Sequence, residues 1–514
     1  MGRPLTMDSL TNLIDGFGVI LTPANLLYVL LGVMIGTVIG VLPGLGPTAT
    51  IALLLPFTYS MEPTSAIIML AGVYYGSMYG GTITSVLLRI PGEAASAVTA
   101  IDGYEMTKAG RAGPALAISA VGSFIGGTIS IIGLILIAPS LAGFAVRFGP
   151  PEYVTLTVLG IVMVTYLGTK STLKSVIAAA IGLLLAVVGT DPIAGTTRFT
   201  LGLPGLFSGI DLVAVAMGLF GVSEILYVME RSGQSHGKIG EVGRLTFSRE
   251  DWKASRGPIT RGSLLGFPIG VLPGGGGVLS SIASYGVEKR RSKHPEEFGK
   301  GAIEGVAGPE TANNASSISA FIPLLTLGLP SNAVLALILG ALMAQNITPG
   351  PQLITAHPEL FWGVIASMLV GNLILLLLNW PMVGFFVQLL RVRIGIIGGI
   401  AMLITLVGVY TLNNSTFDMW VMLIMGVLGY FMRKFGFEPA PLVLAFVLGA
   451  ILEESFRQSM LLSDGSLAIF ATRPISAVLS VFVLLFIASS IWGAVRKDKK
   501  PSIIDQAKEL AGED

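Results

Sequence analysis

Two segments of the chain combine small hydroxyl and amide side chains with a proline about a dozen residues further on. The first runs from Tyr79 to Ser85 and leads to Ile90-Pro91-Gly92-Glu93; the second runs from Ala307 to Ser317 and leads to Leu329-Pro330-Ser331-Asn332. A helix that begins inside a membrane presents unpaired N–H groups and the positive end of its dipole, which suit a carboxylate. Carbonyl oxygens freed at a preceding helix end suit Na⁺. The two segments therefore predict sites for an organic anion and a cation.

A glycine-proline hexapeptide also occurs twice, at Ile39-Gly40-Val41-Leu42-Pro43-Gly44 and at Ile269-Gly270-Val271-Leu272-Pro273-Gly274. The copies are 269 − 39 = 230 residues apart in a chain of 514 residues. Both interrupt apolar stretches with the residues that least tolerate a continuous helix. Matched breaks in two halves are typical of secondary transporters whose site lies where broken helices meet. We therefore expect two related halves with re-entrant turns at Pro43 and Pro273.

These breaks select the candidate site residues. Those predicted to contact substrate are Gly44, Gly46, Thr82, Thr84, Gly92, Gly274, Gly276, Asn314, Ser331 and Asn332. Those predicted as possible Na⁺ ligands are Ser85, Glu93 and Asn313. The competing interpretation is local, because Thr and Ser often bond back to their own helix and Asn often caps a turn. The clustering of such residues in both halves favours a functional site.

Ionisable residues in apolar stretches are functional hypotheses by default. Glu93 and Glu310 stand out because each lies beside a break. Four others are expected to form structural ion pairs: Arg198, Asp211, Glu453 and Arg457. The three histidines lie in polar or loop-like segments, where a solvated surface role is expected.

The composition places these elements in a bilayer. Hydrophobic residues make up 53% of the chain, charged residues 12%, and the mean hydropathy is +0.80. Spans of roughly 20 apolar residues cross the hydrocarbon, and we expect an all-α polytopic membrane protein with ten to twelve transmembrane helices, some broken or re-entrant. The chain contains no cysteine, which excludes disulfides, thiolate nucleophiles and cysteine-ligated metals.

The distribution of positive charge predicts the orientation of the chain in the membrane and the boundaries of its two halves. We expect a first transmembrane repeat at 1–229, a cytoplasmic polar linker at 230–261, a second repeat at 262–494 and a cytoplasmic tail at 495–514, because positive loops stay in the cytoplasm. A third basic loop, Lys289 to Lys293, follows only one apolar stretch after the linker. It reaches the same side if the chain turns back at Pro273. Such irregular backbone is tolerated only where protein or a water-filled cavity supplies hydrogen-bond partners.

Enzyme signatures are missing from the sequence. The chain has no GxxxxGK[ST] phosphate loop, no HExxH zinc motif and no GxSxG elbow. We therefore expect neither an enzyme nor a bound cofactor, and an ion gradient is the natural driving force.

Taken together, the motifs resemble the large membrane subunit of the tripartite tricarboxylate transporters. The resemblance runs from Gly36 to Pro47 through Tyr79 to Thr82, Ile90 to Glu93 and Asp102-Gly103-Tyr104, and continues at Glu304 to Ala315, Pro323 to Pro330 and Pro349-Gly350-Pro351. It implies a bacterial inner-membrane subunit that works with a small membrane subunit and a periplasmic solute-binding protein. It also implies import of a carboxylate such as a tricarboxylate by cation symport, usually with Na⁺.

The sequence is thus interpreted as the substrate-translocating subunit of a binding-protein-dependent, ion-coupled carboxylate importer, with no nucleic-acid partner. Analogy with other transporters favours inverted halves. The alternative is a stand-alone channel or exporter for small organic anions, which would need no binding protein and no coupling ion. An intramembrane hydrolase is disfavoured by the missing nucleophile and metal motifs.

Overall fold

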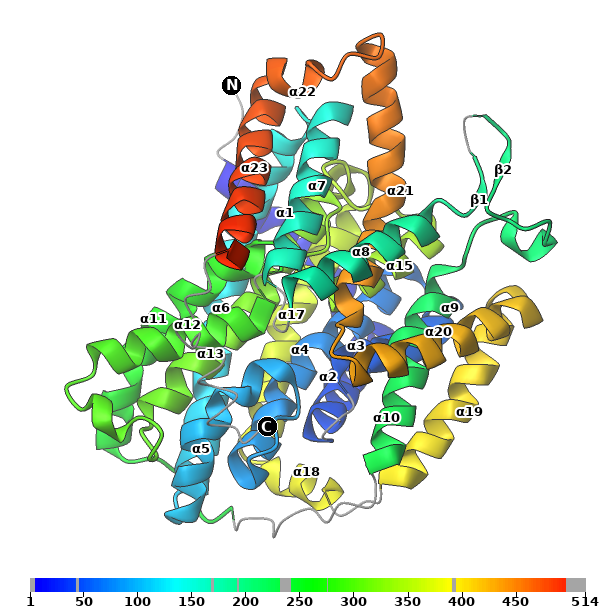
Figure 1. The fold of residues 1–514 in the computed structure, drawn as a ribbon. Helices are drawn as coiled ribbons and strands as arrows, with labels where there is room; N and C mark the ends of the chain where they lie inside the picture. Colours follow the sequence, from blue (N-terminus) through cyan, green and yellow to red (C-terminus); the bar gives the residue numbers. More distant parts are fainter. Residues whose placement is uncertain are drawn as a thin grey trace.

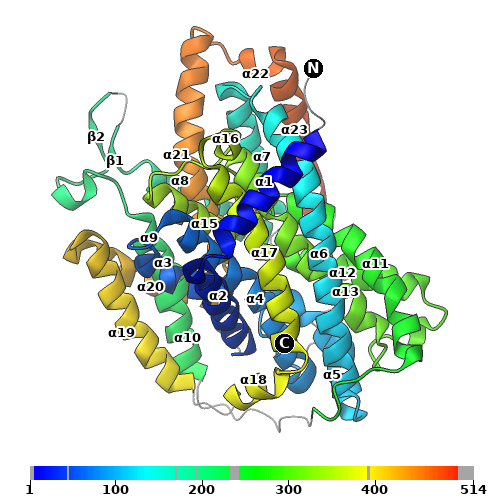
Figure 2. The same cartoon turned by 180° about the vertical axis from the view of Figure 1, so that it is seen from behind.

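The structure is a computed structural model that describes residues 5–42, 46–167, 171–191, 194–231, 242–274, 276–390 and 394–495. It is built almost entirely of helices (Figures 1 and 2). The elements of the first half are α1 (Leu5–Ile20), α2 (Pro23–Val41), α3 (Pro47–Thr58), α4 (Pro63–Leu88), η1 (Ala94–Ala97), α5 (Thr99–Lys108), α6 (Ala112–Ala145), α7 (Pro150–Leu167), α8 (Thr172–Ala186), β1 (Gly189–Thr190), β2 (Thr197–Arg198), η2 (Pro204–Leu206), α9 (Leu212–Ala216), η3 (Met217–Val222) and α10 (Ser223–Arg231).

The second half is also a mixture of short and long helices. Its elements are α11 (Arg249–Val271), α12 (Gly276–Arg291), η4 (Pro295–Glu297), α13 (Glu304–Ser319), α14 (Phe321–Leu327), α15 (Ala333–Ala344), α16 (Leu353–Ala356), α17 (Pro358–Asn379), α18 (Val383–Leu389), α19 (Ile394–Asn413), α20 (Thr416–Lys434), α21 (Pro439–Leu462), α22 (Ile469–Thr472) and α23 (Pro474–Val495). The last turns of the expected linker, 249–261, therefore belong to α11, which begins at the capping box of Ser248 and Asp251.

Six of the described helices are long and apolar enough to cross a membrane: α2, α4, α6, α17, α20 and α21. Several other apolar helices are shorter, among them α3, α8 and α15. The structure thus confirms an all-α polytopic membrane protein. The expected ten to twelve crossings stay a prediction, because half-length helices do not show by themselves where they enter and leave the bilayer.

Two helix pairs, α2–α4 and α11–α13, lie unusually close, and glycine makes their contact possible. A Cβ at Gly32, Gly36 or Gly40 of α2 would overlap backbone carbonyl oxygens of α4. In the second half, a Cβ at Gly262, Gly266 or Gly270 of α11 would overlap those of α13. The two glycine stripes differ in number by 262 − 32 = 230, the offset of the hexapeptide. Each stripe lets two backbones touch, as small residues do in membrane helix pairs.

The chain turns back after the second hexapeptide. α11 and α12 pack side by side, and Arg261 of α11 forms an ion pair with Glu288 of α12. Between these helices, Gly274 has φ +75° and Gly276 φ +42°, left-handed conformations that favour glycine. The expected turn at Pro273 is therefore present as a helical hairpin. The corresponding turn at Pro43 and Gly44 lies outside the described residues.

The outer ends of this hairpin meet the first half of the chain. Asp102 of α5 accepts hydrogen bonds from the backbone N–H groups of Gly299, Gly301 and Ala302 at 2.8–2.9 Å, and from the Tyr285 hydroxyl at 2.9 Å. Arg111, which follows α5, pairs with Asp251 in the first turn of α11. The segment after the basic loop 289–293 and the start of α11 therefore lie at one end of the molecule.

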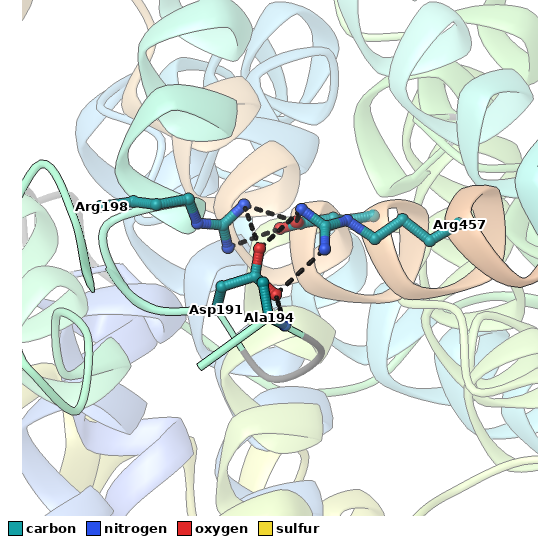
Figure 3. Close-up of polar contacts among 5 residues, drawn as sticks. Asp191, Ala194, Arg198 and Arg457 are labelled. Atoms are coloured by element: carbon teal, nitrogen blue, oxygen red, sulfur yellow. Dashed lines mark hydrogen bonds and ion pairs between the residues drawn. The ribbon is translucent and has the colours of Figure 1, made fainter. Parts of the chain in front are cut away.

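A small arm between α8 and α9 carries β1 and β2 and projects from the helices (Figures 1 and 2). Arg198 of the arm bonds to Glu453 of α21 at 2.6 and 3.2 Å, and Arg457 bonds to Asp191 at 2.8 and 3.0 Å (Figure 3). The expected ion pairs of Arg198, Glu453 and Arg457 are thus confirmed. Asp211 is the exception, because it caps α9 by accepting a hydrogen bond from the Ala214 N–H at 2.8 Å.

One uninterrupted helical stretch lies between the arm and the basic linker. α9, η3 and α10 run without interruption from Leu212 to Arg231. Twenty helical residues span about 30 Å, the thickness of the hydrocarbon core. The arm lies at the end of the molecule that also holds α22, whereas α10 ends near α18 at the other (Figures 1 and 2).

Candidate functional site

One cavity of about 370 Å³ is bordered by the start of α3, by the turn between α11 and α12, and by the two segments in which a helix begins again after a proline, the restarts that follow Pro91 and Pro330. Its lining residues are Gly46, Pro47, Thr48, Tyr74, Met78, Glu93, Ala94, Ala95, Val164, Gly274, Gly276, Gly277, Val278, Leu279, Ile282, Ser331, Asn332, Ala333, Val334, Glu438, Ala440, Pro441 and Leu444. The cavity therefore draws on both halves of the chain, as expected for a site between broken helices.

Four helices begin at the wall of this cavity. The first residues of α3, α12 and α15 belong to the lining, as do the cap and the second residue of α21, Glu438 and Ala440. Each helix start presents the positive end of a dipole, equivalent to roughly half a positive charge. The N–H groups available there are reduced at α3 and α21, because Pro47, Pro439 and Pro441 have none, and at α15, where Asn332 accepts from the Leu335 N–H. No lysine, arginine or histidine is among the lining residues in the described part of the chain. The described lining therefore offers positive charge only through the backbone of these helix starts, and not through basic side chains.

In the first half, the break after α4 leads to an acidic cap. Arg89 ends α4 in the left-handed conformation, with φ +60°, and Glu93 caps η1 by accepting a hydrogen bond from the Ala95 N–H at 2.8 Å. Gly92 lies between them, and its N–H reaches the Gly81 carbonyl at 3.4 Å. A Cβ at Gly92 would overlap the Gly40 carbonyl oxygen and approach Gly81. Only glycine fits where α2, α4 and the restart meet.

In the second half, the break after α14 leads to a neutral cap. Gly328 ends α14 with φ +71°, and Asn332 caps α15 by accepting a hydrogen bond from the Leu335 N–H at 3.0 Å. The Asn332 side chain also donates to the Tyr74 hydroxyl of α4 at 2.9 Å. The Ser331 carbonyl accepts a hydrogen bond from the Gly274 N–H at 2.8 Å, which joins this restart to the α11–α12 turn.

Oxygen atoms suited to a small cation lie behind the acidic cap. Asn313 of α13 donates a hydrogen bond from Nδ2 to Glu93 Oε1 at 3.1 Å. Its Oδ1 is buried and has no hydrogen-bond partner in the residues that the structure describes. A buried acceptor without a donor is costly, and hard cations are bound by carboxylate and carbonyl oxygens. Glu93 Oε1 and Asn313 Oδ1 therefore fit a cation such as Na⁺.

A second buried carboxyl group lies deeper, between the halves. Glu310 of α13 accepts hydrogen bonds from the Thr82 hydroxyl at 2.7 Å and the Thr99 hydroxyl at 2.5 Å. Asn314 donates to the Glu310 backbone carbonyl at 3.1 Å and to the Ser123 hydroxyl at 2.7 Å. Glu310 is fully buried and does not line the cavity. It links α4, α5 and α13 behind the cavity wall.

The structure divides the predicted site residues into three groups. Those that line the cavity are Gly46, Glu93, Gly274, Gly276, Ser331 and Asn332. Those that lie outside its lining are Thr82, Thr84, Ser85, Gly92, Asn313 and Asn314. Thr84 and Ser85 bond to the Gly81 carbonyl of their own helix, as the local interpretation expects. Gly44 falls outside the described residues, and the binding roles of all of them stay predictions.

Several lining residues were not predicted from the sequence. Tyr74 and Met78 are four residues apart, so they lie on one face of α4, but that face carries no break. Glu438 precedes Pro439 and Pro441 and so had the signal of a helix start; it was missed because this start is not part of the repeated hexapeptide. Val164 is an ordinary apolar residue of α7 and had no signal at all.

Comparison with known proteins gives matches over most of the chain. A family model described as the tripartite tricarboxylate transporter TctA family matches residues 26–444. An uncharacterized 52.8 kDa protein of Agrobacterium vitis, from the TAR-I ttuC′ 3′ region, is 47% identical over 500 residues, which are 97% of this chain and 100% of that protein. An uncharacterized Agrobacterium vitis protein from the TAR-II ttuC′ 3′ region is 48% identical over 237 residues, or 46% of this chain and 98% of that protein. No solved structure gives a significant match.

Proposed function

The chain belongs to the tripartite tricarboxylate transporter TctA family, and we propose that it is the substrate-translocating subunit of a carboxylate importer coupled to a cation, for which Na⁺ is the best candidate. The importer works in the bacterial inner membrane with a periplasmic solute-binding protein and a small membrane subunit. These partners follow from the family, whose description is tripartite.

The observation that supports carboxylate binding is the convergence of helix starts on one cavity. α3, α12, α15 and α21 each direct a positive dipole end towards it. A carboxylate placed there accepts hydrogen bonds from backbone N–H groups that no intrahelical carbonyl uses. Two of these starts belong to the hairpin and restart of the second half, and α3 belongs to the first half, so a bound anion would touch both.

The cation site rests on Glu93 and Asn313. Asn313 Nδ2 contacts Glu93 Oε1 at the acidic cap, and Asn313 Oδ1 lies next to Gly277 of the cavity wall, whose added Cβ would contact it. A cation held there would neutralise Glu93 beside the anion and so favour binding of both. Such mutual stabilisation is reciprocal: the anion raises the affinity for the cation by the same factor.

Corresponding contacts in the two halves favour inverted repeats. The α2–α4 pair and the α11–α13 pair use glycines at the same offset. α3 packs on α15 of the other half, and α12 packs on η1 of the other half. A pseudo-two-fold axis through the cavity would relate these contacts, as in other transporters built from inverted repeats.

The alternative, a stand-alone channel or exporter of small organic anions, makes a different prediction for reconstituted protein. We expect uptake of a labelled carboxylate into proteoliposomes only when the binding protein, the small subunit and an inward Na⁺ gradient are all present. Uptake that persists without binding protein and without Na⁺ would favour the channel. Replacing Na⁺ by K⁺ at equal ionic strength, and then imposing a pH gradient, identifies the coupling ion.

A further inference from the structure

We infer that the cavity selects carboxylates of low charge that carry an apolar body, such as a monocarboxylate with a ring or alkyl chain, over trivalent tricarboxylates. This inference rests on the proposed function and concerns the substrate class of the same site.

Most of the cavity wall is hydrocarbon. Larger side chains without a polar group come from five helices: Met78 of α4, Val164 of α7, Val278, Leu279 and Ile282 of α12, Val334 of α15, and Leu444 of α21. The polar side chains include Tyr74, Glu93 and Asn332, and two of these are already bonded to each other. A second or third carboxylate on a substrate would meet apolar surface and lose its hydration without compensation.

The charges of the lining lead to the same conclusion. Glu93 is acidic, and the described lining holds no lysine, arginine or histidine. Positive charge is offered to a substrate only by the helix starts, at roughly half a charge each, and by a cation held at Glu93 and Asn313. Each carboxylate that a substrate carries beyond the first adds a negative charge near Glu93 in a region of low dielectric, so a trianion is less well compensated than a monocarboxylate.

The size of the cavity suits this class of substrate. Its 370 Å³ lies at the small end of the range typical of small-molecule sites. A single carboxylate bound at a helix start leaves most of this space for an apolar group in contact with α7 and α12. Such a group gains binding free energy from burial against side chains that a citrate ion cannot use.

The test measures ligand binding by the full-length chain, purified with its small subunit and reconstituted in nanodiscs in Na⁺ buffer. Thermal unfolding is followed against concentration for phenylacetate, hexanoate, malate and citrate. We expect a monocarboxylate to stabilise the protein with an apparent affinity at least 10-fold higher than that of citrate. Tighter binding of citrate would overturn the inference and leave the proposed function standing. Failure of every carboxylate to bind, with and without Na⁺, would overturn the proposed function itself.

Two variants at one half-buried position sharpen the test. Val278→Lys places a cation in the cavity, and Val278→Met adds a side chain of similar length without charge. We expect Val278→Lys to shift the ratio of citrate to hexanoate affinity by at least 10-fold towards citrate, and Val278→Met to leave that ratio within about 2-fold. An equal shift in both variants would mean that volume, not charge, governs selection. If Val278→Lys does not fold, the ranking of ligands by the unmodified chain decides.

Discussion

The two restarts that border the cavity, 89–97 and 328–344, use the same backbone plan with different chemistry. Each helix ends at a left-handed residue, Arg89 with φ +60° or Gly328 with φ +71°. Each restart begins at an extended cap, Glu93 with φ −143° or Asn332 with φ −152°. Both caps also bond across to the other half: Glu93 accepts from Asn313, and Asn332 donates to Tyr74.

The difference lies in charge and in helix length. The first restart carries a carboxylate and only a four-residue 3₁₀ helix, whereas the second carries a neutral amide and the twelve-residue α15. A longer helix start with a neutral cap suits an anion, and an acidic cap suits a cation. Under the proposed function, two similar backbone breaks would therefore serve ions of opposite charge because their cap residues differ.

The largest effect is expected at the residue before each cap, because the two restarts differ in the room that they leave for a side chain there. Gly92→Ser would push a side chain into the Gly40 carbonyl, so we expect a destabilisation of about 3 kcal/mol or loss of folded protein. Ser331→Gly, the matched change in the second half, is expected to cost about 1 kcal/mol at most. Thermal unfolding and yield of the purified variants measure both. Equal tolerance at the two positions would show that the first restart is not sterically limited.

The next largest effect is expected from removing the negative charge of the first cap. Glu93→Gln keeps an acceptor for the Ala95 N–H but removes the negative charge beside Asn313. We expect at least a 10-fold rise in the Na⁺ concentration needed for half-maximal uptake, which corresponds to about 1.4 kcal/mol. The substrate KM at saturating Na⁺ should change less. An unchanged Na⁺ curve in a well-folded variant would remove Glu93 from the cation site.

A complementary change adds charge to the neutral cap. Asn332→Asp retains the capping acceptor for the Leu335 N–H but places a negative charge where the substrate carboxylate is expected. We predict a substrate KM raised about 10-fold with an unchanged Na⁺ requirement. Asn332→Ser, which caps without charge, is the control for lost contact with Tyr74. If Asn332→Asp and Asn332→Ser change the substrate KM equally, the charge at this restart does not act on the substrate.

The smallest effect tests the cross-half bond of the neutral cap. Tyr74→Phe removes the hydroxyl that accepts from Asn332 Nδ2, and the loss of one such bond costs about 1 kcal/mol. We expect a KM increase of about 5-fold, with folding yield nearly unchanged. The double variant Tyr74→Phe, Asn332→Ser should show less than the sum of the two effects. Additive effects would mean that the two side chains act independently.

The sequence predicted features that depend on local chemistry and missed those that depend on packing. The hexapeptide at Pro273 predicted a turn because proline and glycine interrupt a helix wherever they occur. Asn332 was predicted from its place after Pro330, and it lines the cavity. Thr82 was predicted in the same way, yet it bonds to Glu310 from α13, 228 residues further on. Adjacency to a break does not say which side of the helix a side chain faces.

Distant partners account for the remaining differences. Tyr74 meets Asn332 across 258 residues, and no local pattern connects them. Glu438 reaches the cavity because α21 packs against α7, α8 and α15. These neighbours are selected by the match of helix surfaces over the whole fold, which a single sequence does not display.

The glycine stripes have a mechanical consequence. Where α2 touches α4 and α11 touches α13, backbone lies on backbone, and sliding one helix by a single residue would drive side chains into carbonyl oxygens. The two helices of each pair are therefore expected to move together as one rigid unit. Val164 and Leu444 instead present hydrocarbon side chains to the cavity, and contacts between such side chains exchange neighbours at lower cost. During a transport cycle, we expect the α2–α4 and α11–α13 pairs to move as rigid units relative to this apolar wall of the cavity.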